Sequence, residues 1–151
     1  MGVSKLLEKF NFKKSFGQNF ILDTNFQKAI VSDCGVSKDD EVLEIGAGAG
    51  TLTNALAEAC GKVVSYEKDE SLREILSESV TSDNVTIKFC DILSKPLEEI
   101  ESDFNDRYTM VANLPYYITT PIIFHFLPSK KLKCLNIMVQ KEVAERIVAK
   151  P

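Results

Sequence analysis

The chain of 151 residues is 44% hydrophobic and 26% charged, which fits one ordinary globular domain with a sizeable core. Its 18 Lys and Arg residues against 22 Asp and Glu residues give a formal net charge of -4, so the overall charge gives no support for nucleic-acid binding. No apolar stretch approaches the ~20 residues of a membrane span, and Glu8 interrupts any signal-peptide pattern, so we expect a cytoplasmic protein without a membrane partner.

Apolar periodicity predicts alternating helices and strands along the chain. In chain order, we expect a helix over 24–32, a strand over 41–45, a helix over 51–60, a strand over 62–67, a helix over 70–80, a strand over 85–90, a short acidic helix near Leu97, a strand over 108–112, a strand over 134–139 and a helix over 142–149. Before the last strand, Pro121 fits the first turn of a helix behind Thr120 as N-cap, with 122–127 as its buried face. This alternation predicts an α/β fold, with a mostly parallel sheet and helices on both faces, and we treat 1–151 as one domain.

The segment EIGAGAG (44–50) follows the first strand and opens a helix. Glycines there permit a tight turn and a close approach of the backbone to a ligand, and the first N–H groups of the helix face the same place. The segment departs from the dinucleotide fingerprint G-x-G-x-x-G because the residue five positions after Gly46 is Thr51. A turn without that third glycine suits the nucleoside and amino-acid halves of S-adenosylmethionine, which need no phosphate cradle.

Two acidic residues end the next two strands. Glu67 closes the second strand, where a carboxylate can accept both hydroxyls of a ribose. Asp91 follows the third strand, where it can accept from the amino group of adenine. Either acid alone is more often a helix N-cap or a solvated loop residue. Together with the glycine loop, on three successive strands, they indicate a nucleoside site.

The tetrapeptide Asn113-Leu114-Pro115-Tyr116 follows the fourth strand and points to the chemistry. The exocyclic amine of adenine is a poor nucleophile because its lone pair is delocalised into the ring. Acceptors at both of its hydrogens, here the Asn113 side-chain oxygen and the Leu114 carbonyl, favour a pyramidal nitrogen and release that lone pair. Pro115 stiffens the turn, and the ring of Tyr116 can stack on an extruded base, a contact worth ~1–3 kcal/mol. The leaving group is neutral, so positioning and electrostatics suffice and no metal is needed.

With these motifs in order, the chain resembles the adenine-N6 dimethyltransferases of small-subunit ribosomal RNA, the KsgA family of class I methyltransferases. The resemblance runs from Lys13 to Pro151 and is carried by the segments KKSFGQNFILDTN (13–25), VLEIGAGAGTLT (42–53), YEKD (66–69), CDIL (90–93), NLPYYITTPIIF (113–124) and MVQKEVAERIVAKP (138–151). It implies a Rossmann-like sheet and S-adenosylmethionine as the methyl donor. It further implies ribosome biogenesis as the role, by transfer of two methyl groups to each of two adjacent adenosines in a hairpin near the 3′ end of 16S rRNA, within the immature small subunit.

The same resemblance implies which residues hold the cofactor. Asn19 and Ile21 would contact it, although the family usually has Leu at the position of Ile21, and Gln18 would help to close the N-terminal segment over it. The other cofactor-binding residues that it implies are Gly46, Gly48, Glu67, Lys68, Asp91, Ile92 and Asn113.

The resemblance also implies that the fold continues past this chain. Class I methyltransferases usually add an antiparallel hairpin after the fifth strand, and this family adds a helical C-terminal domain; neither fits after Pro151. We therefore expect a fragment that keeps the cofactor residues, and its own capacity for methyl transfer stays open. Its fifth strand would expose an edge through which chains can self-associate, whereas the complete protein is expected to be a monomer.

Three other interpretations remain. The erythromycin-resistance methylases of large-subunit rRNA share the QNF and N-x-P-[YF] motifs, but Asp23-x-Asn25 and the runs YYITTPIIF and VQKEVAERIVAKP favour the small-subunit branch. A nicotinamide-dependent oxidoreductase with a variant glycine loop leaves NLPY unexplained. A ribosome-assembly module would bind RNA without chemistry.

The remaining polar residues carry weaker signals. Four scattered cysteines without C-x-x-C spacing and a single histidine predict no zinc site, with Cys60 and Cys90 as reduced core residues and His125 as a structural one. Residues 1–15 hold four lysines against one glutamate, and residues 130–133 hold three lysines. Either segment can contact RNA phosphates. Solvation explains residues 1–15 equally well, and it is the better interpretation of residues 130–133.

Overall fold

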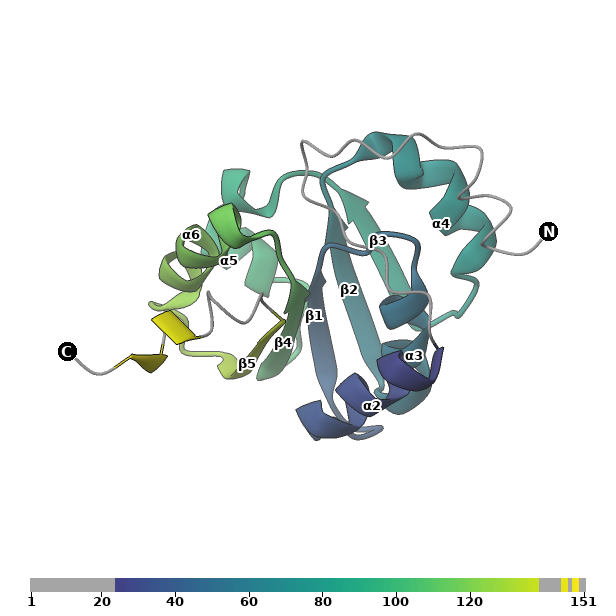
Figure 1. Ribbon diagram of the computed structural model, residues 1–151, viewed down its shortest axis with the longest axis horizontal. Coiled ribbons are helices and arrows are strands. Elements are labelled where there is room, and N and C mark those ends of the chain that lie inside the picture. The colour runs from purple at the N-terminus through teal and green to yellow at the C-terminus, as the bar shows by residue number, and fades with distance from the viewer. Residues whose placement is uncertain (1–23, 139–144, 147, 150–151) are drawn as a thin grey trace.

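The computed structural model describes residues 24–138, 145–146 and 148–149. In this part of the chain, strands pair in parallel in the order β3-β2-β1-β4-β5 (Figure 1). The strands are β1 (Glu41–Ile45), β2 (Lys62–Glu67), β3 (Val85–Phe89), β4 (Tyr108–Asn113) and β5 (Leu132–Met138). The predicted parallel sheet is therefore confirmed.

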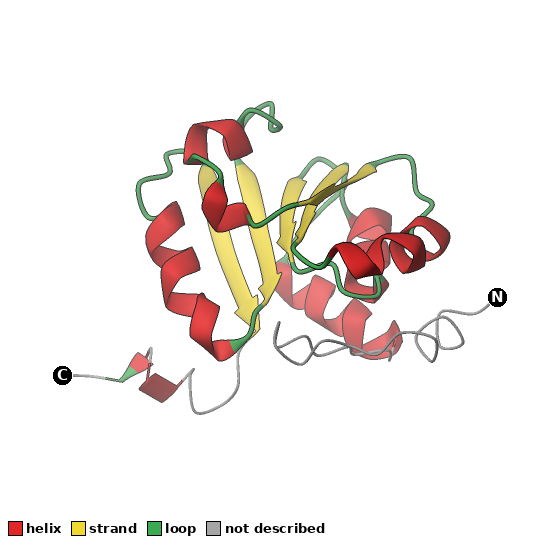
Figure 2. Cartoon of the chain, turned by 90° about the horizontal axis from the view of Figure 1, so that it is seen from above, coloured by secondary structure: helices red, strands yellow, loops and turns green. Residues whose placement is uncertain are grey.

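Helices cover both faces of this sheet, as Figure 2 shows from above. The helices before β3 lie on one face and those after it on the other. They are α2 (Thr24–Cys34), α3 (Thr51–Ala59) and α4 (Arg73–Ser79), then α5 (Leu97–Glu101) and α6 (Tyr116–Phe126), with short 3-10 turns η2 (Glu70–Leu72) and η3 (Ile92–Ser94). This change of side after β3 is what right-handed crossover connections require when the chain returns to the other side of β1.

The core lies on both faces of the central strands. Leu43 and Ile45 of β1 pack in a cluster with residues of α5 and α6, whereas Val42 packs with residues of α2 and α3. Each of these three side chains is at most 5% exposed. Complete burial of such a side chain stabilises the fold by roughly 1.5–3 kcal/mol. Burial on both faces explains why the central strands are nearly continuous apolar runs.

The helix after β4 begins earlier than predicted. Pro115 is its N-cap residue, with φ −60° and ψ 148°, and the carbonyl of Pro115 accepts a hydrogen bond of 3.2 Å from the Ile118 N–H. Pro121 therefore lies inside α6 rather than in its first turn. The expected buried face over 122–127 is also partly wrong, because Phe124 is 64% exposed. The sequence contains two prolines that could begin a helix, and the first of them, Pro115, separates β4 from α6.

Other boundaries differ by smaller amounts. The helix expected over 70–80 divides into η2 and α4, because Asp69 caps the 3-10 turn by accepting from the Ser71 N–H at 2.9 Å. The fifth strand begins at Leu132, two residues before the predicted start. Most of the helix expected over 142–149 lies outside the described residues. Cys60 is buried as predicted, and Cys90 is half-buried against the core.

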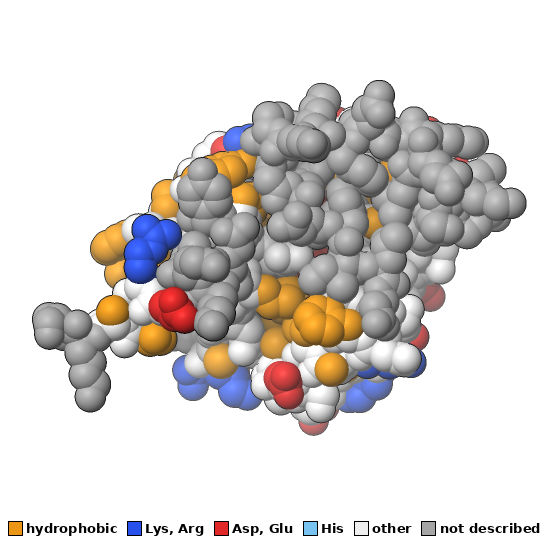
Figure 3. Space-filling model, viewed as in Figure 1, with side chains coloured by type: hydrophobic (Ala, Val, Ile, Leu, Met, Phe, Trp, Pro, Cys, Tyr) orange, Lys and Arg blue, Asp and Glu red, His pale blue; other side chains and the backbone are white. Residues whose placement is uncertain are grey.

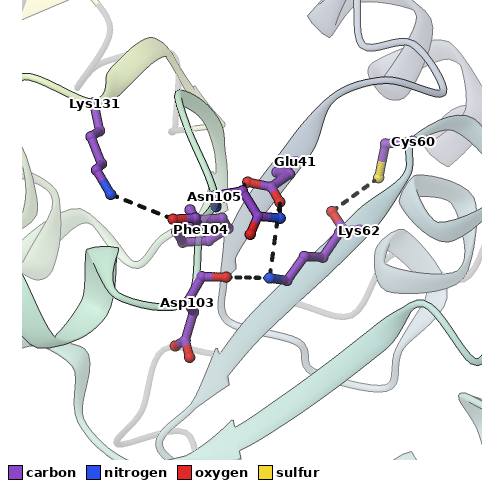
Figure 4. Close-up of polar contacts among 7 residues, drawn as sticks. All are labelled: Glu41, Cys60, Lys62, Asp103, Phe104, Asn105 and Lys131. Carbon is purple, nitrogen blue, oxygen red and sulfur yellow. Dashed lines mark hydrogen bonds and ion pairs between the residues drawn. The ribbon is translucent and has the colours of Figure 1, made fainter.

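Polar contacts close the amino end of the sheet (Figure 4). The Glu41 carboxylate accepts from the Asn105 backbone N–H at 2.9 Å and from its side-chain amide at 2.7 Å. The Lys62 ammonium donates to the Asp103 carbonyl and lies 3.9 Å from Glu41. These contacts tie the loop before β4 to the first residues of β1 and β2.

The lysines around the start of β5 belong to this same end of the sheet. Lys131 donates to the Phe104 carbonyl at 3.4 Å, and Lys133 lies 3.5 Å from Asp40. Figure 3 shows charges of both signs along the lower edge of the described surface on this side of the molecule. Their engagement with neighbours favours the solvated-loop interpretation of residues 130–133 over an RNA contact.

The glycine that begins α3 gives a test of this packing. Gly50 has φ +87°, and a Cβ built on it would lie 2.5 Å from Val80 Cγ2. Gly35 has φ +66° but nothing within 4 Å of such a Cβ. We expect Gly35→Ala to lower the free energy of unfolding by about 1 kcal/mol, from backbone strain alone, and Gly50→Ala by about 2–4 kcal/mol, because overpacking adds to that strain. Urea denaturation measures both values, and equal losses would contradict the packing of Gly50 against Val80.

Candidate functional site

The candidate site lies where the carboxyl ends of three neighbouring strands meet. In the register of the sheet, Ile45 of β1 pairs with Tyr66 of β2 on one side and with Ala112 of β4 on the other. The residues that follow this row are Gly46 after β1, Glu67 at the end of β2 and Asn113 at the end of β4. All three therefore lie at one edge of the sheet. This is also the point where the strand order reverses about β1, the position at which ligands bind in open α/β sheets.

The glycine loop lies directly against the end of β4. The Gly46 N–H donates to the Tyr66 carbonyl at 2.8 Å, and Gly46 and Gly48 have φ of +87° and +58°. A Cβ built on Gly46 would lie 3.3 Å from the carbonyl oxygen of Asn113. Glycine thus brings two strand ends into contact at a point where another side chain would crowd the backbone and adopt a strained φ.

Glu67 joins the loop after β1 to the turn after β2. Its side chain is almost completely buried, with a residue exposure of 3%. One carboxylate oxygen accepts from the Gly48 N–H at 2.9 Å and the other from the Asp69 N–H at 2.9 Å. Hydrogen bonds from backbone N–H groups to a carboxylate are charge-assisted and hence strong. The predicted ribose acceptor is therefore also the residue that fixes the glycine loop.

Asp91 acts in the structure as a helix cap and as half of an ion pair. Its Oδ1 accepts from the Leu93 N–H at 3.0 Å, and its Oδ2 lies 3.5 Å from the Lys68 ammonium. The Asp91 side chain is 35% exposed and that of Lys68 54%, so the pair is accessible to solvent and adds little stability. Ile92, which follows, is buried in the core cluster beside α5 and α6.

The tetrapeptide follows directly on β4. Asn113 is half-buried as the last residue of the strand, Leu114 is 7% exposed and packs in the core, and Pro115 caps α6. Tyr116 is the first residue of α6, but its predicted stacking ring lies outside what the structure describes. Gln18, Asn19 and Ile21 also lie outside the described residues.

The sequence analysis missed the role of Glu44. This residue is completely buried within β1, and its Oε1 accepts from the Thr53 hydroxyl at 2.5 Å and the Ser65 hydroxyl at 2.7 Å. Burial raises its pKa to about 7, and the nearby Glu67 carboxylate adds to the shift. An acid between the apolar residues of VLEI was the available signal, since Glu is rarely buried without partners.

The described residues form neither a metal-ion cluster nor a membrane-spanning helix. Across 24–138, 145–146 and 148–149, no three His, Cys, Asp or Glu side chains are grouped so that they could hold a metal ion. Within those same ranges, no helix has both the length and the apolar character needed to cross a bilayer.

Comparison with known sequences places this site in a family context. The family model described as "Ribosomal RNA adenine dimethylase" matches residues 9–151. "Ribosomal RNA small subunit methyltransferase A" of Enterococcus faecalis is 44% identical over 99% of this chain and 53% of its own length. The protein of the same name from Geobacillus thermodenitrificans is 45% identical over 94% of this chain and 50% of its own length. The chain thus spans about half the length of these relatives.

Solved structures of methyltransferases share this fold. The 23S rRNA methyltransferase ErmE superposes with a TM-score of 0.73 at 26% identity, over 84% of this chain and 50% of that one. A dimethyladenosine transferase from Plasmodium falciparum gives a TM-score of 0.71 at 27% identity, over 87% of this chain and 47% of that one. An O-methyltransferase from Thermotoga maritima, at 18% identity and a TM-score of 0.62, shares the fold.

The family match covers nearly all of the chain and includes every motif that meets at the strand ends. The chain therefore belongs to the ribosomal RNA adenine dimethylase family.

Proposed function

We propose that this chain forms the S-adenosylmethionine-binding part of a small-subunit rRNA adenine-N6 dimethyltransferase. The observation that carries the proposal is the contact between the glycine loop and the end of β4, where a Cβ on Gly46 would lie 3.3 Å from the Asn113 carbonyl oxygen. A methyl donor held by the first element is thereby adjacent to an amine held by the second. Such proximity is a main source of rate in a reaction between two bound molecules.

The residues at the strand ends fit this cofactor. Gly46 leaves room where a side chain would fill the space beside Asn113, and Gly48 shapes the same loop. A carboxylate offers about four acceptor sites, so Glu67 can receive ribose hydroxyls in addition to its two backbone N–H groups. Asp91 can accept from the adenine amino group. When bound, S-adenosylmethionine supplies a methyl group on a positively charged sulfur.

The other cofactor contacts are part of the same proposal. Lys68 and Ile92 flank the adenine end beside Asp91, with Lys68 able to leave its exposed ion pair when the adenine amino group arrives. Asn19 and Ile21 would contact the cofactor, and Gln18 would help to close the N-terminal segment over it.

The tetrapeptide would prepare the target amine. The Asn113 side-chain oxygen and the Leu114 carbonyl accept its two hydrogens, which turns the nitrogen lone pair toward the methyl group. Pro115 holds both acceptors in place, because its carbonyl and fixed φ begin α6 immediately after the strand. The ring of Tyr116 would stack on the extruded adenine.

The substrate that we propose is the small-subunit rRNA, at two adjacent adenosines in a hairpin near the 3′ end of 16S rRNA, within immature subunits in the cytoplasm. Similarity supports this choice, since the curated relatives that are 44–45% identical to this chain are named for the small subunit. Because those relatives are about twice as long, the complete activity would require residues beyond this chain. In the described part of the sheet, β5 pairs with β4 alone, and its other edge is where two chains would self-associate.

Substitution of Asn113 tests the catalytic role. We expect Asn113→Ala to reduce methyl transfer at least ~100-fold, because it removes an acceptor that acts on the reacting amine. The assay measures tritiated methyl incorporation into immature small subunits, with this chain and with its fusion to the remaining half of the Enterococcus faecalis relative. Asn105→Ala, at the opposite end of the sheet, is the matched control and should leave the rate unchanged. Equal activity of both variants, or no incorporation by the fusion, would refute the proposal.

Calorimetry tests the cofactor class separately. S-adenosylhomocysteine should release heat on binding to this chain, and NAD should not. Asp91→Ala should weaken binding by about 10–100-fold, because one hydrogen bond to a charged acceptor is lost. Asp83→Ala, an exposed acid in the turn before β3, should not change the affinity. Heat from NAD alone would instead support an oxidoreductase.

A further inference from the structure

The buried carboxyl of Glu44 has no part in the mechanism above. Glu44 is 0% exposed. The hydroxyls of Thr53 on α3 and Ser65 on β2 both donate hydrogen bonds to the same carboxylate oxygen, Oε1. The second oxygen, Oε2, has no hydrogen-bond partner among the residues that the structure describes. A buried acceptor without a partner is rare and costly, more so when it carries charge.

The Thr53 and Ser65 hydroxyls favour the ionised form of Glu44, but burial and the nearby Glu67 carboxylate outweigh them. Besides the hydroxyls of Thr53 and Ser65, it interacts electrostatically with the Glu67 carboxylate on β2 and the Cys60 thiol after α3. On β4, its register partner is Val111. Burial is the largest cause that raises the Glu44 pKa to about 7, so near neutral pH this carboxyl is about half protonated.

Glu44 also lies close to the place where the methyl donor must react. Glu44 lies on β1, and Gly46 is the first residue after that strand. At the rise of a strand, the backbones of these two residues are about 7 Å apart. Gly46 in turn touches Asn113, beside which the sulfonium must lie if the amine there is to be methylated. If the sulfonium lies on the order of 10 Å from the carboxyl, then at an effective dielectric constant of ~20 its unit positive charge would favour ionisation by about tenfold.

We propose that Glu44 is a proton-linked positioning residue, which holds its proton more tightly in the free protein than when the cationic methyl donor is bound. The O–H bond of its carboxyl breaks, the proton passes to bulk water, and the resulting carboxylate balances the sulfonium charge. This inference rests on the proposed function. It gives the site a means to distinguish the donor from the product, because the sulfur of S-adenosylhomocysteine is neutral.

Proton release can be counted by calorimetry of S-adenosylmethionine binding in two buffers with different ionisation enthalpies. If binding shifts the ionisation of Glu44 tenfold, the chain should release about half a proton near pH 6.5 and bind the donor about fivefold more tightly at pH 8 than at pH 6. S-adenosylhomocysteine should release clearly less. The α-amino group of the donor also titrates near this range, so the Glu44→Gln variant supplies the reference.

Glu44→Gln is the matched control because it resembles the protonated carboxyl in shape and in charge. It should bind the donor without the Glu44-dependent proton release. In the free protein, the folded-state pKa lies above its ordinary value of 4.5, so Glu44 stabilises the fold most at low pH and less as the pH rises toward 7. The melting temperature of Glu44→Gln relative to the parent should therefore rise between pH 5 and pH 8. This pH dependence of stability reports the raised pKa alone. A purely structural role would show it too, but the parent chain and Glu44→Gln would then release equal numbers of protons on binding the donor.

The outcomes separate the two proposals. If neither S-adenosylmethionine nor S-adenosylhomocysteine binds, the proposed function fails and this inference fails with it. If both bind and Glu44→Gln releases as many protons as the parent chain, the proton linkage alone is refuted.

Discussion

The position of β1 between β2 and β4 is the constraint on which the candidate site depends. Parallel pairing on both sides places the ends of three strands at one edge, and the absence of a side chain at Gly46 lets the first loop touch the Asn113 backbone. Under the proposed function, neither the loop nor the tetrapeptide alone would bring the methyl donor and the target amine together. The juxtaposition comes from the sheet register, which the apolar residues on both faces of β1 hold in place.

Those features that follow from strand and loop patterns could be predicted from the sequence. Alternating apolar segments gave the parallel sheet, and the carboxyl ends of parallel strands necessarily share an edge. Glu67 and Asn113 were therefore expected to be neighbours although they are far apart in the sequence, and the structure places them on either side of Gly46. For Asp91, the sequence predicted the position after β3. Its hydrogen bond to the Leu93 N–H and its ion pair with Lys68 depend on the geometry of the turn and could be seen only in the structure.

Two features could not be predicted: the start of α6, where two local signals compete, and the hydrogen bonds of Glu44, whose donors are distant in the sequence. Pro115 and Pro121 each carry the preference for the first turn of a helix, and only the end of β4 decides between them. Glu44 forms part of an apolar strand, and nothing nearby in sequence shows that Ser65 from the next strand would be its donor. Sequence periodicity identifies which face is buried, but it does not identify the hydrogen bonds formed inside.

The two backbone hydrogen bonds of Glu67 also limit which ligands this fold can accept. Because one carboxylate anchors turns from both β1 and β2, it cannot rotate out of the way without loosening both turns. A fixed negative charge at the tip of β2 would repel nucleosides that carry a phosphate on the ribose. Evolution toward such a ligand would require the rebuilding of two turns rather than the exchange of one side chain.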